Sequence, residues 1–407
     1  MQVGHCCYAG RVPTLHQTES QSVQSDYCDP EPFEIEAQGI SLKFYPGGKG
    51  RLEALLELIS EAQESLKIAF YIFACDQSGE RVRDALVEAA QRGVKVAVIV
   101  DGFGAEANEE FFERLVAAGG TFCAFLAKWS RRTLIRNHQK IVIADDRLAM
   151  LGGFNVENSY FAPPEDNGWK DMAFTVKGSV VPRIVDWFRE LSAWASDDKA
   201  QFRDIRRRVR EWDGRDGPVQ LLIGGPTRGL SSWAKCVRRD LGRSRKLAMM
   251  MAYFAPDRRM RRGIRHIARR GEADLILAGK SDNNATIGAA RALYPRLVKA
   301  GARVYEFQPC KLHAKLVVLD DAVYLGSANL DMRSLYVNLE IVLRIEDRAL
   351  AEKMRNFILD HVPASERITD AWLDKNAAWY KRLRWWASWF LVSVVDYTVS
   401  RKLNLGL

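Results

Sequence analysis

Two nearly identical stretches of this chain carry residues whose types could do chemistry. They read HQKIVIADD, beginning at His138, and HAKLVVLDD, beginning at His313, so one order of polar and apolar residues occurs twice, 175 positions apart. Side chains alternate between the two faces of a strand, which places His138 with Lys140 and His313 with Lys315. Each stretch therefore presents one imidazole beside one ammonium group, a pair that catalysis can use.

The residues that follow each pair are repeated as well. Asp145 and Asp320 begin a turn into a second short strand, which ends in LGGFN in the first copy and in LGSANLD in the second. The glycines let backbone approach a ligand closely, and Asn155, Ser327 and Asn329 add neutral hydrogen-bonding groups for a substrate. Asp145 and Asp320 stand at an odd spacing from the histidine–lysine pairs, which turns them off that face and favours a structural role.

One copy of this pattern alone could be an apolar strand with a solvated histidine and lysine at its start. The chain holds six histidines, and two of them stand in matching contexts, with lysine, aspartate, glycine and asparagine at nearly equal offsets. Coincidence does not account for this match, and a duplicated fold by itself would not require both polar sets. The repeat therefore predicts a function for both copies.

The elements that must position these residues are also duplicated. Apolar runs and capped helical stretches predict a strand, a helix and a strand in each half, at 66–73, 78–93 and 94–100 and again at 247–254, 257–271 and 273–279. Each set is a βαβ unit. We predict an α/β protein with two βαβ-rich halves, 40–200 and 218–365, joined by a basic linker at 201–217.

The composition is that of a globular protein with anionic partners. Of the 407 residues, 47% are hydrophobic and 10% aromatic, enough for burial to offset the ordering of most of the chain. Lysine and arginine number 60 against 51 acidic residues, a net charge of +9. This surplus suits phosphate-bearing lipid or nucleic acid equally well.

The seven cysteines are odd in number and scattered, a pattern typical of a reduced, intracellular protein. We interpret them as buried small residues. No two pairs have the matched spacing of zinc ligands, so no metal site is predicted. The cysteines are Cys6, Cys7, Cys28, Cys75, Cys123, Cys236 and Cys310.

Residues 1–39 differ from the rest of the chain. They hold one basic residue, Arg11, among many acidic, serine, glutamine and proline residues. This composition predicts a flexible tail. A secretory signal would need a basic start followed by an apolar run, and the segment has neither.

The doubled pattern H-x-K-x4-D followed by G-G/S-x-N resembles the phospholipase D superfamily over roughly residues 41–365. Both motifs are complete, with His138, Lys140, Asp145, Gly152 and Asn155 in the first and His313, Lys315, Asp320, Gly326, Ser327 and Asn329 in the second. The resemblance implies two halves packed about a pseudo-two-fold axis, with both motifs in one active site. It implies that His138 attacks phosphorus and that His313 protonates the leaving alcohol.

The residue types fit chemistry on a phosphodiester, which is anionic and resists attack. Lys140 and Lys315, with Asn155 and Asn329, can hold its non-bridging oxygens without a metal or another cofactor. A phosphohistidine intermediate then permits acid catalysis in the first step and base catalysis in the second, each worth about 100- to 10,000-fold.

Each catalytic histidine needs the correct tautomer, so a carboxylate is expected at its other ring nitrogen. Asp171 in GWKDMAFTV and Glu340 in VNLEIVLRI stand at corresponding points of the two halves. Superfamily members similarly carry a strand carboxylate there. The alternative for each residue is an ordinary surface acid at the start of a strand.

Further stretches, including AYFAPD at 252–257 and GKSDN at 279–283, resemble bacterial cardiolipin synthases, here of a type without N-terminal transmembrane helices. One departure is Gln139, where those enzymes commonly carry arginine, and we expect it to affect head-group contacts. The resemblance implies phosphatidyl transfer from phosphatidylglycerol to a second lipid, and it makes nucleic acid an unlikely substrate. A phospholipase D or endonuclease that uses water as the acceptor, and a non-catalytic membrane-binding protein, are the alternatives.

Residues 366–407 form a tail with the pattern of an amphipathic helix. Basic residues lie off its apolar stripe, and its most apolar run, 385–395, is too short to span a bilayer. The stripe is Trp372, Trp379, Leu383, Trp386, Phe390, Val394 and Tyr397. We predict interfacial binding to an anionic membrane, peripheral on the cytoplasmic side of the inner membrane. The alternative is a helix packed on the domain or on a partner subunit.

Overall fold

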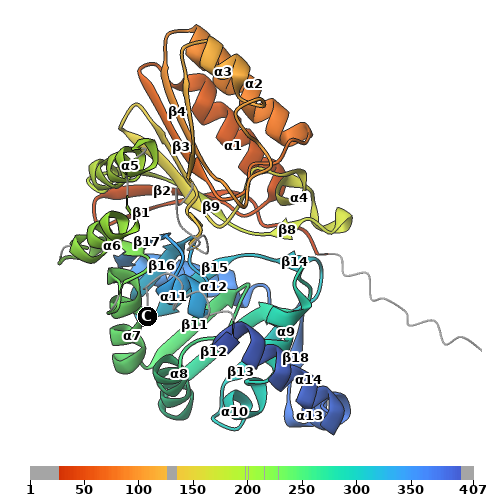
Figure 1. Cartoon of the computed structure of the whole chain (residues 1–407). Coiled ribbons are helices and arrows are strands. Elements are labelled where there is room, and N and C mark those ends of the chain that lie inside the picture. Colours follow the sequence, from red (N-terminus) through yellow and green to blue (C-terminus); the bar gives the residue numbers. More distant parts are fainter. Residues whose placement is uncertain are drawn as a thin grey trace, which may run out of the picture.

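The computed structural model describes residues 27–125 and 135–395, apart from positions 198, 200, 215 and 228. The predicted tail as far as residue 26 lies outside these residues, as do Tyr397 and the rest of 396–407. Two mixed eight-stranded sheets, one from each half of the chain, form the body of the described structure. Figure 1 shows the first half, in red to yellow, stacked on the second, in green to blue.

The first sheet has the strand order β1-β2-β9-β7-β6-β3-β4-β5. Its strands are β1 (Phe33–Ala37), β2 (Ile40–Tyr45), β3 (Ser65–Phe70), β4 (Lys95–Asp101), β5 (Thr121–Phe125), β6 (Ile141–Ala144), β7 (Leu148–Gly152) and β9 (Ala173–Gly178). β3, β4 and β5 are parallel, and the other neighbours are antiparallel.

The second sheet has the order β10-β17-β16-β15-β11-β12-β13-β18. Its strands are β10 (Val219–Gly224), β11 (Lys246–Met251), β12 (Glu272–Ala278), β13 (Arg303–Phe307), β15 (Lys315–Leu319), β16 (Ala322–Gly326), β17 (Glu340–Glu346) and β18 (Ser365–Ile368). β11, β12 and β13 are the parallel strands. Seven strands match those of the first sheet in order and direction, so the predicted α/β duplication is confirmed.

Helices cover the sheets and share three apolar cores with them. The largest core joins the inner faces of both sheets with α5 and α12, while the other two lie under α1–α3 and under α7–α10. The helices are α1 (Gly48–Glu61), α2 (Gln77–Gln91), α3 (Glu113–Ala117), α4 (Asn158–Phe161), α5 (Val181–Ser196), α6 (Phe202–Glu211), α7 (Ser232–Arg243), α8 (Arg258–Arg270), α9 (Asn284–Arg291), α10 (Tyr294–Val298), α11 (Met332–Tyr336), α12 (Arg348–Leu359), α13 (Asp370–Asn376) and α14 (Trp379–Phe390). The halves therefore form one body around a shared core.

Backbone contacts at two places join the halves close to the histidines. β8 (Trp169–Lys170) pairs in parallel with β14 (Lys311–Leu312), and a separate bridge joins Asn137 to Leu339. The first junction joins the residues just before His313 to those just before Asp171. The second joins the residue before His138 to the residue before Glu340. These short pairings therefore fix how the two motifs face one another.

Two expectations from the sequence need correction, and the predicted linker gains a helix. Residues 33–37, predicted within the flexible tail, form β1, because their alternating pattern pairs with β2 and packs Phe33 on the shared core. The predicted linker contains a helix, α6. Cys28 and Cys75 are exposed, and of the described cysteines only Cys310 is buried.

The C-terminal segment folds as α13 and α14, followed by a π-helical turn at Leu391–Val395. Among the described helices, none combines the length and the apolar character that crossing a membrane requires.

Candidate active site

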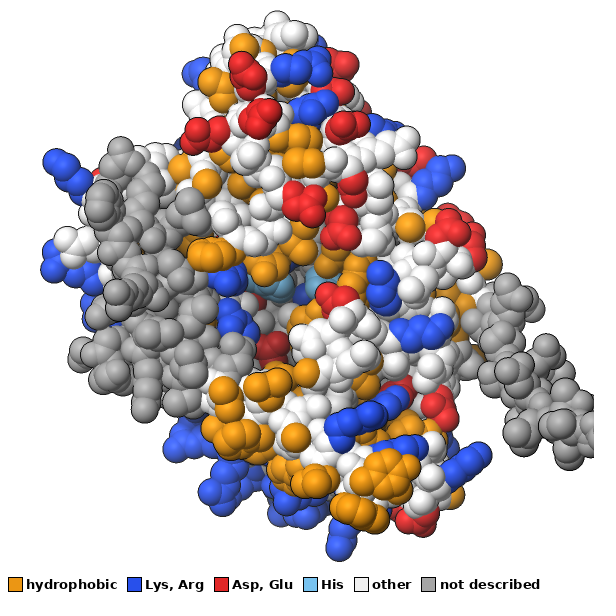
Figure 2. Space-filling view, turned by 45° about the vertical axis from the view of Figure 1, so that its right-hand side comes forward, with side chains coloured by type: hydrophobic (Ala, Val, Ile, Leu, Met, Phe, Trp, Pro, Cys, Tyr) orange, Lys and Arg blue, Asp and Glu red, His pale blue; other side chains and the backbone are white. Residues whose placement is uncertain are grey.

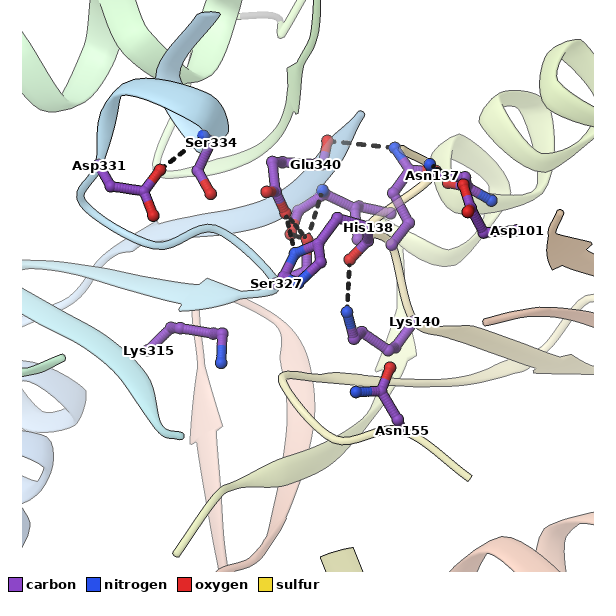
Figure 3. A network of polar contacts seen from close by, with 12 residues as sticks. Asp101, Asn137, His138, Lys140, Asn155, Lys315, Ser327, Asp331, Ser334 and Glu340 are labelled. Carbon is purple, nitrogen blue, oxygen red and sulfur yellow. Dashed lines mark hydrogen bonds and ion pairs between the residues drawn. The ribbon is translucent and has the colours of Figure 1, made fainter. Parts of the chain in front are cut away.

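His138 lies three residues before β6, with its ring buried between the two halves. Its Nδ1 is 3.1 Å from Oε2 of Glu340, the first residue of β17 in the second half. Ser327 donates a hydrogen bond to the same carboxylate oxygen. The main-chain N–H of His138 donates to the carbonyl oxygen of Leu339 at 3.0 Å. Main-chain and side-chain contacts thus hold the ring in one orientation (Figure 3).

His313, in the second half, has the corresponding contacts with residues of the first half. Its Nδ1 is 2.6 Å from Oδ2 of Asp171, a residue of the first half. The other oxygen of Asp171 accepts the main-chain N–H of Met172 at 2.7 Å. The main-chain N–H of His313 donates to the carbonyl oxygen of Lys170 at 2.8 Å. Asp171 is therefore held from both sides.

Each histidine is oriented by a carboxylate of the other half. The sequence predicted Asp171 and Glu340 as the carboxylates, and both are buried beside a histidine rather than at the surface. It did not predict the exchange between halves. Because each carboxylate engages Nδ1, Nε2 is the ring nitrogen that can react with a substrate; in His313 it lies 3.5 Å from the Tyr160 hydroxyl.

The two lysines lie beside the histidines in the same buried space. Lys140 Nζ donates to the carbonyl oxygen of His138 at 2.8 Å, and Lys315 Nζ donates to that of His313. Figure 3 shows Lys140 and Asn155 of the first half opposite Lys315 of the second. Burial lowers the pKa of Lys140 to about 7 and that of Lys315 to about 8, against the raising influence of the nearby carboxylates.

The charged groups of each motif affect the pKa of the histidine in the other. Burial, then Lys140 and then Lys315, lower the pKa of His138 well below its usual value. Burial and both lysines also lower the pKa of His313, to about 3 despite the raising effect of Asp171. Each lysine thus acts on the histidine of the other half as well as on its own. In the free site both imidazoles are neutral, the form in which a histidine is a nucleophile.

The two carboxylates differ in their pKa. Burial raises the pKa of Glu340 to about 8, even though Lys140 lowers it. Burial also acts on Asp171, but Lys315 and His313 outweigh it, so the pKa of Asp171 lies below its ordinary value. Asp171 beside His313 therefore stays ionised, whereas Glu340 beside His138 is more readily protonated.

Three neutral residues were predicted to contact the substrate. Asn155 accepts the main-chain N–H of Ile72 at 3.2 Å through its amide oxygen, while Asn329 Oδ1 has no hydrogen-bond partner within the described residues. Ser327 needs correction, because its buried hydroxyl donates to Glu340 and accepts the N–H of Ile341 at 3.1 Å. Both of its hydrogen-bonding functions are used inside the protein.

Asp145 and Asp320 belong to the motifs but not to the site. Asp145 accepts the main-chain N–H groups of Gln63, Glu64 and Ser65, and Asp320 accepts those of Arg245 and Lys246. Five residues of extended strand separate each aspartate from its motif lysine, a span of about 16 Å. Although both belong to the catalytic motifs, these aspartates lie away from the site, and the structural role that their spacing favoured fits the contacts.

Gln139 was expected to affect head-group contacts, and the structure contradicts this expectation. Its side chain is fully buried and faces away from the histidine–lysine face. Nε2 donates to the carbonyl oxygen of Glu340 at 3.1 Å, and Oε1 accepts the indole N–H of Trp187 at 3.0 Å. Gln139 therefore supports the residue that orients His138.

Sequence reasoning missed the aromatic residues around the histidines. The ring of Tyr71 lies 5.0 Å from that of His138, and the ring of Tyr160 lies 5.1 Å from that of His313. Tyr253 lies 6.2 Å from His313 and is the second residue after β11, whereas Tyr71 directly follows β3. Tyr71 and Tyr253 stand at different positions of the two repeats, so comparing the repeats does not single them out, and nothing in the sequence singles out Tyr160.

The histidines lie at the floor of a hollow between the halves, where Figure 2 shows pale-blue side chains among apolar walls. Within the described part of the chain, no three metal-ligating side chains gather in a way that could hold an ion. Two oriented imidazoles and two ammonium groups can together attack, clamp and protonate a phosphodiester. This fold and this site define the phospholipase D class of protein.

A family profile described as "Cardiolipin synthase, PLD-like domain" matches residues 55–191 and 237–361. These segments cover most of both halves, and the chain belongs to this family. The resemblance to bacterial cardiolipin synthases that the sequence motifs indicated is confirmed.

Curated relatives agree with the family match. Cardiolipin synthase B of Shigella flexneri is 30% identical over 356 residues, which are 84% of this chain and 85% of that protein. Cardiolipin synthase of Clostridium perfringens is 27% identical over 341 residues, which are 81% of this chain and 71% of that protein.

Solved structures share the fold at low sequence identity. Phosphatidylserine synthase of Haemophilus influenzae has a TM-score of 0.71 at 14% identity and covers 91% of this chain and 96% of its own. Polyphosphate kinase of Porphyromonas gingivalis has a TM-score of 0.56 at 17% identity, covering 83% of this chain and 49% of its own.

Proposed function

We propose that this protein is a phosphatidyltransferase that makes cardiolipin, passing a phosphatidyl group between two phospholipids through a phosphohistidine. The observation that carries the proposal is the pair of buried histidines, each oriented through Nδ1 by a carboxylate of the opposite half. Such a site has two nitrogens for one phosphorus, so one can bond to it while the other moves a proton. The names of the curated relatives support the lipid substrate.

In the first step, His138 Nε2 attacks phosphorus of the donor lipid. The bond from phosphorus to the head-group oxygen breaks, and His313 gives that oxygen a proton as it leaves. Lys140 and Lys315 bind the non-bridging oxygens, which keep their negative charge throughout. The bound anion offsets these ammonium groups and so raises the pKa of His313, whose protonated form Asp171 also stabilises.

In the second step, an acceptor hydroxyl replaces the departed alcohol. His313 now takes the proton of that hydroxyl, the new oxygen bonds to phosphorus, and the bond from phosphorus to His138 breaks. Each histidine returns to its initial state. With phosphatidylglycerol as donor and as acceptor, the products are cardiolipin and glycerol.

The direct test is a product analysis with the purified protein and vesicles of phosphatidylglycerol. We expect cardiolipin and free glycerol to appear in equal amounts. His138→Ala protein, purified in the same way, is the control for contaminating activity. Phosphatidic acid in place of cardiolipin would identify water as the acceptor and would replace this proposal with the hydrolase.

We also infer that the protein acts as a peripheral enzyme at an anionic membrane surface, on the cytoplasmic side of the inner membrane. Exposed aromatic and aliphatic side chains on α14 support this inference, among them Trp379, Leu383 and Phe390. Fractionation of cells should find the protein with the membranes and should release it with high salt. Recovery in the soluble fraction at low salt would contradict the inference.

A further inference from the structure

Seven arginines on α8 form a strongly basic surface beside the C-terminal helices. None of them has an ion pair within the described residues. Asp257, the acid nearest in sequence, already accepts the main-chain N–H of Met260 and the hydroxyl of Tyr336. Met260, Ile264 and Ile267 face the core of the second half. Their burial explains why the helix packs there, but not why it carries so many arginines. The charge of this face calls for an anionic partner.

Two arginines connect this surface to α14. The Arg261 guanidinium lies over the ring of Trp389 at 5.2 Å, and Arg296 of α10 lies over Trp386 at 5.4 Å. The rings of Trp386 and Trp389 meet edge to face at 5.2 Å. Three helices thus bring two guanidinium groups and two indoles to one place. Burial and then the neighbouring Arg296 and Arg265 lower the pKa of Arg261, as crowding of like charges should.

Two hydrogen-bond donors at this place lack an acceptor. Arg261 Nε and Trp389 Nε1 are both buried, and neither has a partner within residues 27–125 and 135–395. Buried donors without an acceptor are uncommon and destabilising in folded proteins. One oxygen-rich anion that enters between the two cation–π pairs, with a small shift of these side chains, could accept from both groups.

The two faces of α14 have different surroundings. Trp385 is buried against Ala292 and Ala377, and Ser388 lies so close to Gly288 that a Cβ there would come within 2.7 Å of the serine hydroxyl. Leu383 is 64% exposed and Phe390 is 54% exposed on the outward side. Figure 2 shows hydrophobic and basic side chains side by side at the lower end of the molecule. The helix is anchored to the protein by one face and presents the other.

We propose that the junction of α8, α10 and α14 is a docking site for an anionic phospholipid bilayer, in which Arg261, Arg296 and the Trp389 indole bind a head-group phosphate. Leu383, Trp386 and Phe390 enter the interface around it. The proposal rests on the lipid function proposed above and adds a second phosphate site, outside the catalytic hollow, that holds the enzyme on its substrate surface. Charge complementarity selects the bilayer, because a second copy of this basic surface would repel it.

The test is co-sedimentation with vesicles of phosphatidylcholine containing phosphatidylglycerol, using the full-length chain. Arg261→Gln/Arg296→Gln should bind about 30-fold more weakly, as expected for two basic side chains lost at an anionic surface. Arg81→Gln/Lys95→Gln, which removes two exposed charges from the first half, is the matched control and should bind within about threefold of wild type. Trp389→Phe keeps the stacked ring and removes only the donor, and it should bind several-fold more weakly.

Two further measurements separate docking from catalysis and from folding. Turnover of a short-chain phosphatidylglycerol in solution should stay within about twofold of wild type in all these variants, because the docking site lies outside the catalytic hollow. Free inorganic phosphate at millimolar concentration should not displace the protein from vesicles. If wild type makes no cardiolipin but the variants still lose vesicle binding, the proposed function fails and the docking site stands.

Three results would overturn the docking site. The first is equal vesicle binding by wild type and Arg261→Gln/Arg296→Gln, and the second is an equal loss in the first-half control, which would mean that only net charge matters. The third is a change of oligomeric state in the Arg261→Gln/Arg296→Gln protein, seen by light scattering, which would make this surface an interface between copies.

Discussion

The two half-sites use the same residue types in different surroundings. His138 faces Glu340, whose carboxylate is buried and supported by the Ser327 hydroxyl, and whose pKa is raised by that burial to about 8. His313 faces Asp171, which the Met172 N–H and Lys315 help to keep ionised. A carboxylate that stays ionised stabilises an imidazolium better than one that is readily protonated. The difference favours His313 as the group that carries a proton and His138 as the group that attacks.

One position explains part of this difference. Gly153 stands in the first motif where Ser327 stands in the second, and a Cβ at Gly153 would come within 2.5 Å of the Asp171 carboxylate. Asp171 therefore cannot have a serine hydroxyl beside it in the way that Glu340 does. The duplicated site has diverged at the residues behind the histidines, while the histidines and lysines are the same in both halves.

The largest effect should come from the histidines. His138→Ala and His313→Ala should each lower turnover of phosphatidylglycerol by at least about 10,000-fold, because neither half-site can both attack and transfer the proton. Circular dichroism and thermal unfolding would show whether the fold is retained. Substantial turnover in either variant would mean that the two halves do not share one reaction.

The carboxylates should separate the two roles. Asp171→Asn should lower kcat about 1,000-fold with phosphatidylglycerol and Glu340→Gln about 10- to 100-fold, because a protonated His313 needs the stronger charge. With a nitrophenyl phosphodiester, whose leaving group needs no proton, the Asp171→Asn defect should shrink to about tenfold.

The substrate whose leaving group needs no proton also provides the control for comparing the two carboxylate variants. The defect of Glu340→Gln should be similar with both substrates, since His138 attacks phosphorus in each case. If Glu340→Gln is the variant rescued by the nitrophenyl ester, the roles of the two histidines are reversed.

The two lysines predict the basic limb of the pH profile. The pKa of Lys140 is about 7 and that of Lys315 about 8 in the free site, and both must be charged to bind an anionic phosphodiester. Raising the pH removes these protons, so kcat/KM should fall at least about tenfold between pH 7 and pH 9. Lys140→Met should leave a shallower limb at the higher pKa. A flat profile up to pH 9 would contradict charged lysines as the clamp.

Asp145 should matter for stability and not for turnover. Burial is the largest single influence and raises the pKa of Asp145, but three main-chain N–H groups together outweigh it, so the pKa is lowered. Asp145→Asn should cost about 1 kcal/mol of unfolding free energy at pH 7 while kcat stays within about twofold. The wild-type advantage is present above the unfolded pKa of about 4 and is lost as pH falls through the folded value. Asp321→Asn, at an exposed neighbour of Asp320, is the control for urea unfolding.

The smallest effect is expected for chelation. Lys140 and Lys315 supply the positive charge at the phosphate in this mechanism, so incubation with a chelator should leave kcat within experimental error. Activity that is lost in the chelator and restored by one particular divalent ion would show that the lysines of the two halves are not sufficient.

The sequence predicted the duplicated fold and the chemical groups of the site, because each histidine–lysine pair leads into the same repeated apolar strand. It also placed Asp171 and Glu340 at equivalent points. Their exchange between halves depends on β8 pairing with β14 through two residues each, and so short a pairing leaves no periodic signal. The same limit applies to Tyr160, which reaches His313 from a four-residue helix.

Other predictions failed where a residue's neighbours decide its role. Gln139 stands between two motif residues, yet strand alternation turns it toward Trp187 and away from the substrate. Ser327 looked like a substrate ligand because it has a hydroxyl in the motif, but Glu340 occupies that hydroxyl. For the tail, spacing predicted an apolar stripe, and the structure adds that Trp385 anchors the helix by its other face.

The central claim is that the two halves form one site in which His138 bonds to phosphorus and His313 moves the proton. The most direct measurement is acid-free quenching of His313→Ala protein after reaction with a nitrophenyl phosphodiester labelled at phosphorus, whose leaving group needs no proton, followed by mapping of the label. The mechanism predicts label on His138 in this variant and none on the His138→Ala protein. Label on His313 in the His138→Ala protein, with none on the His313→Ala protein, would contradict it.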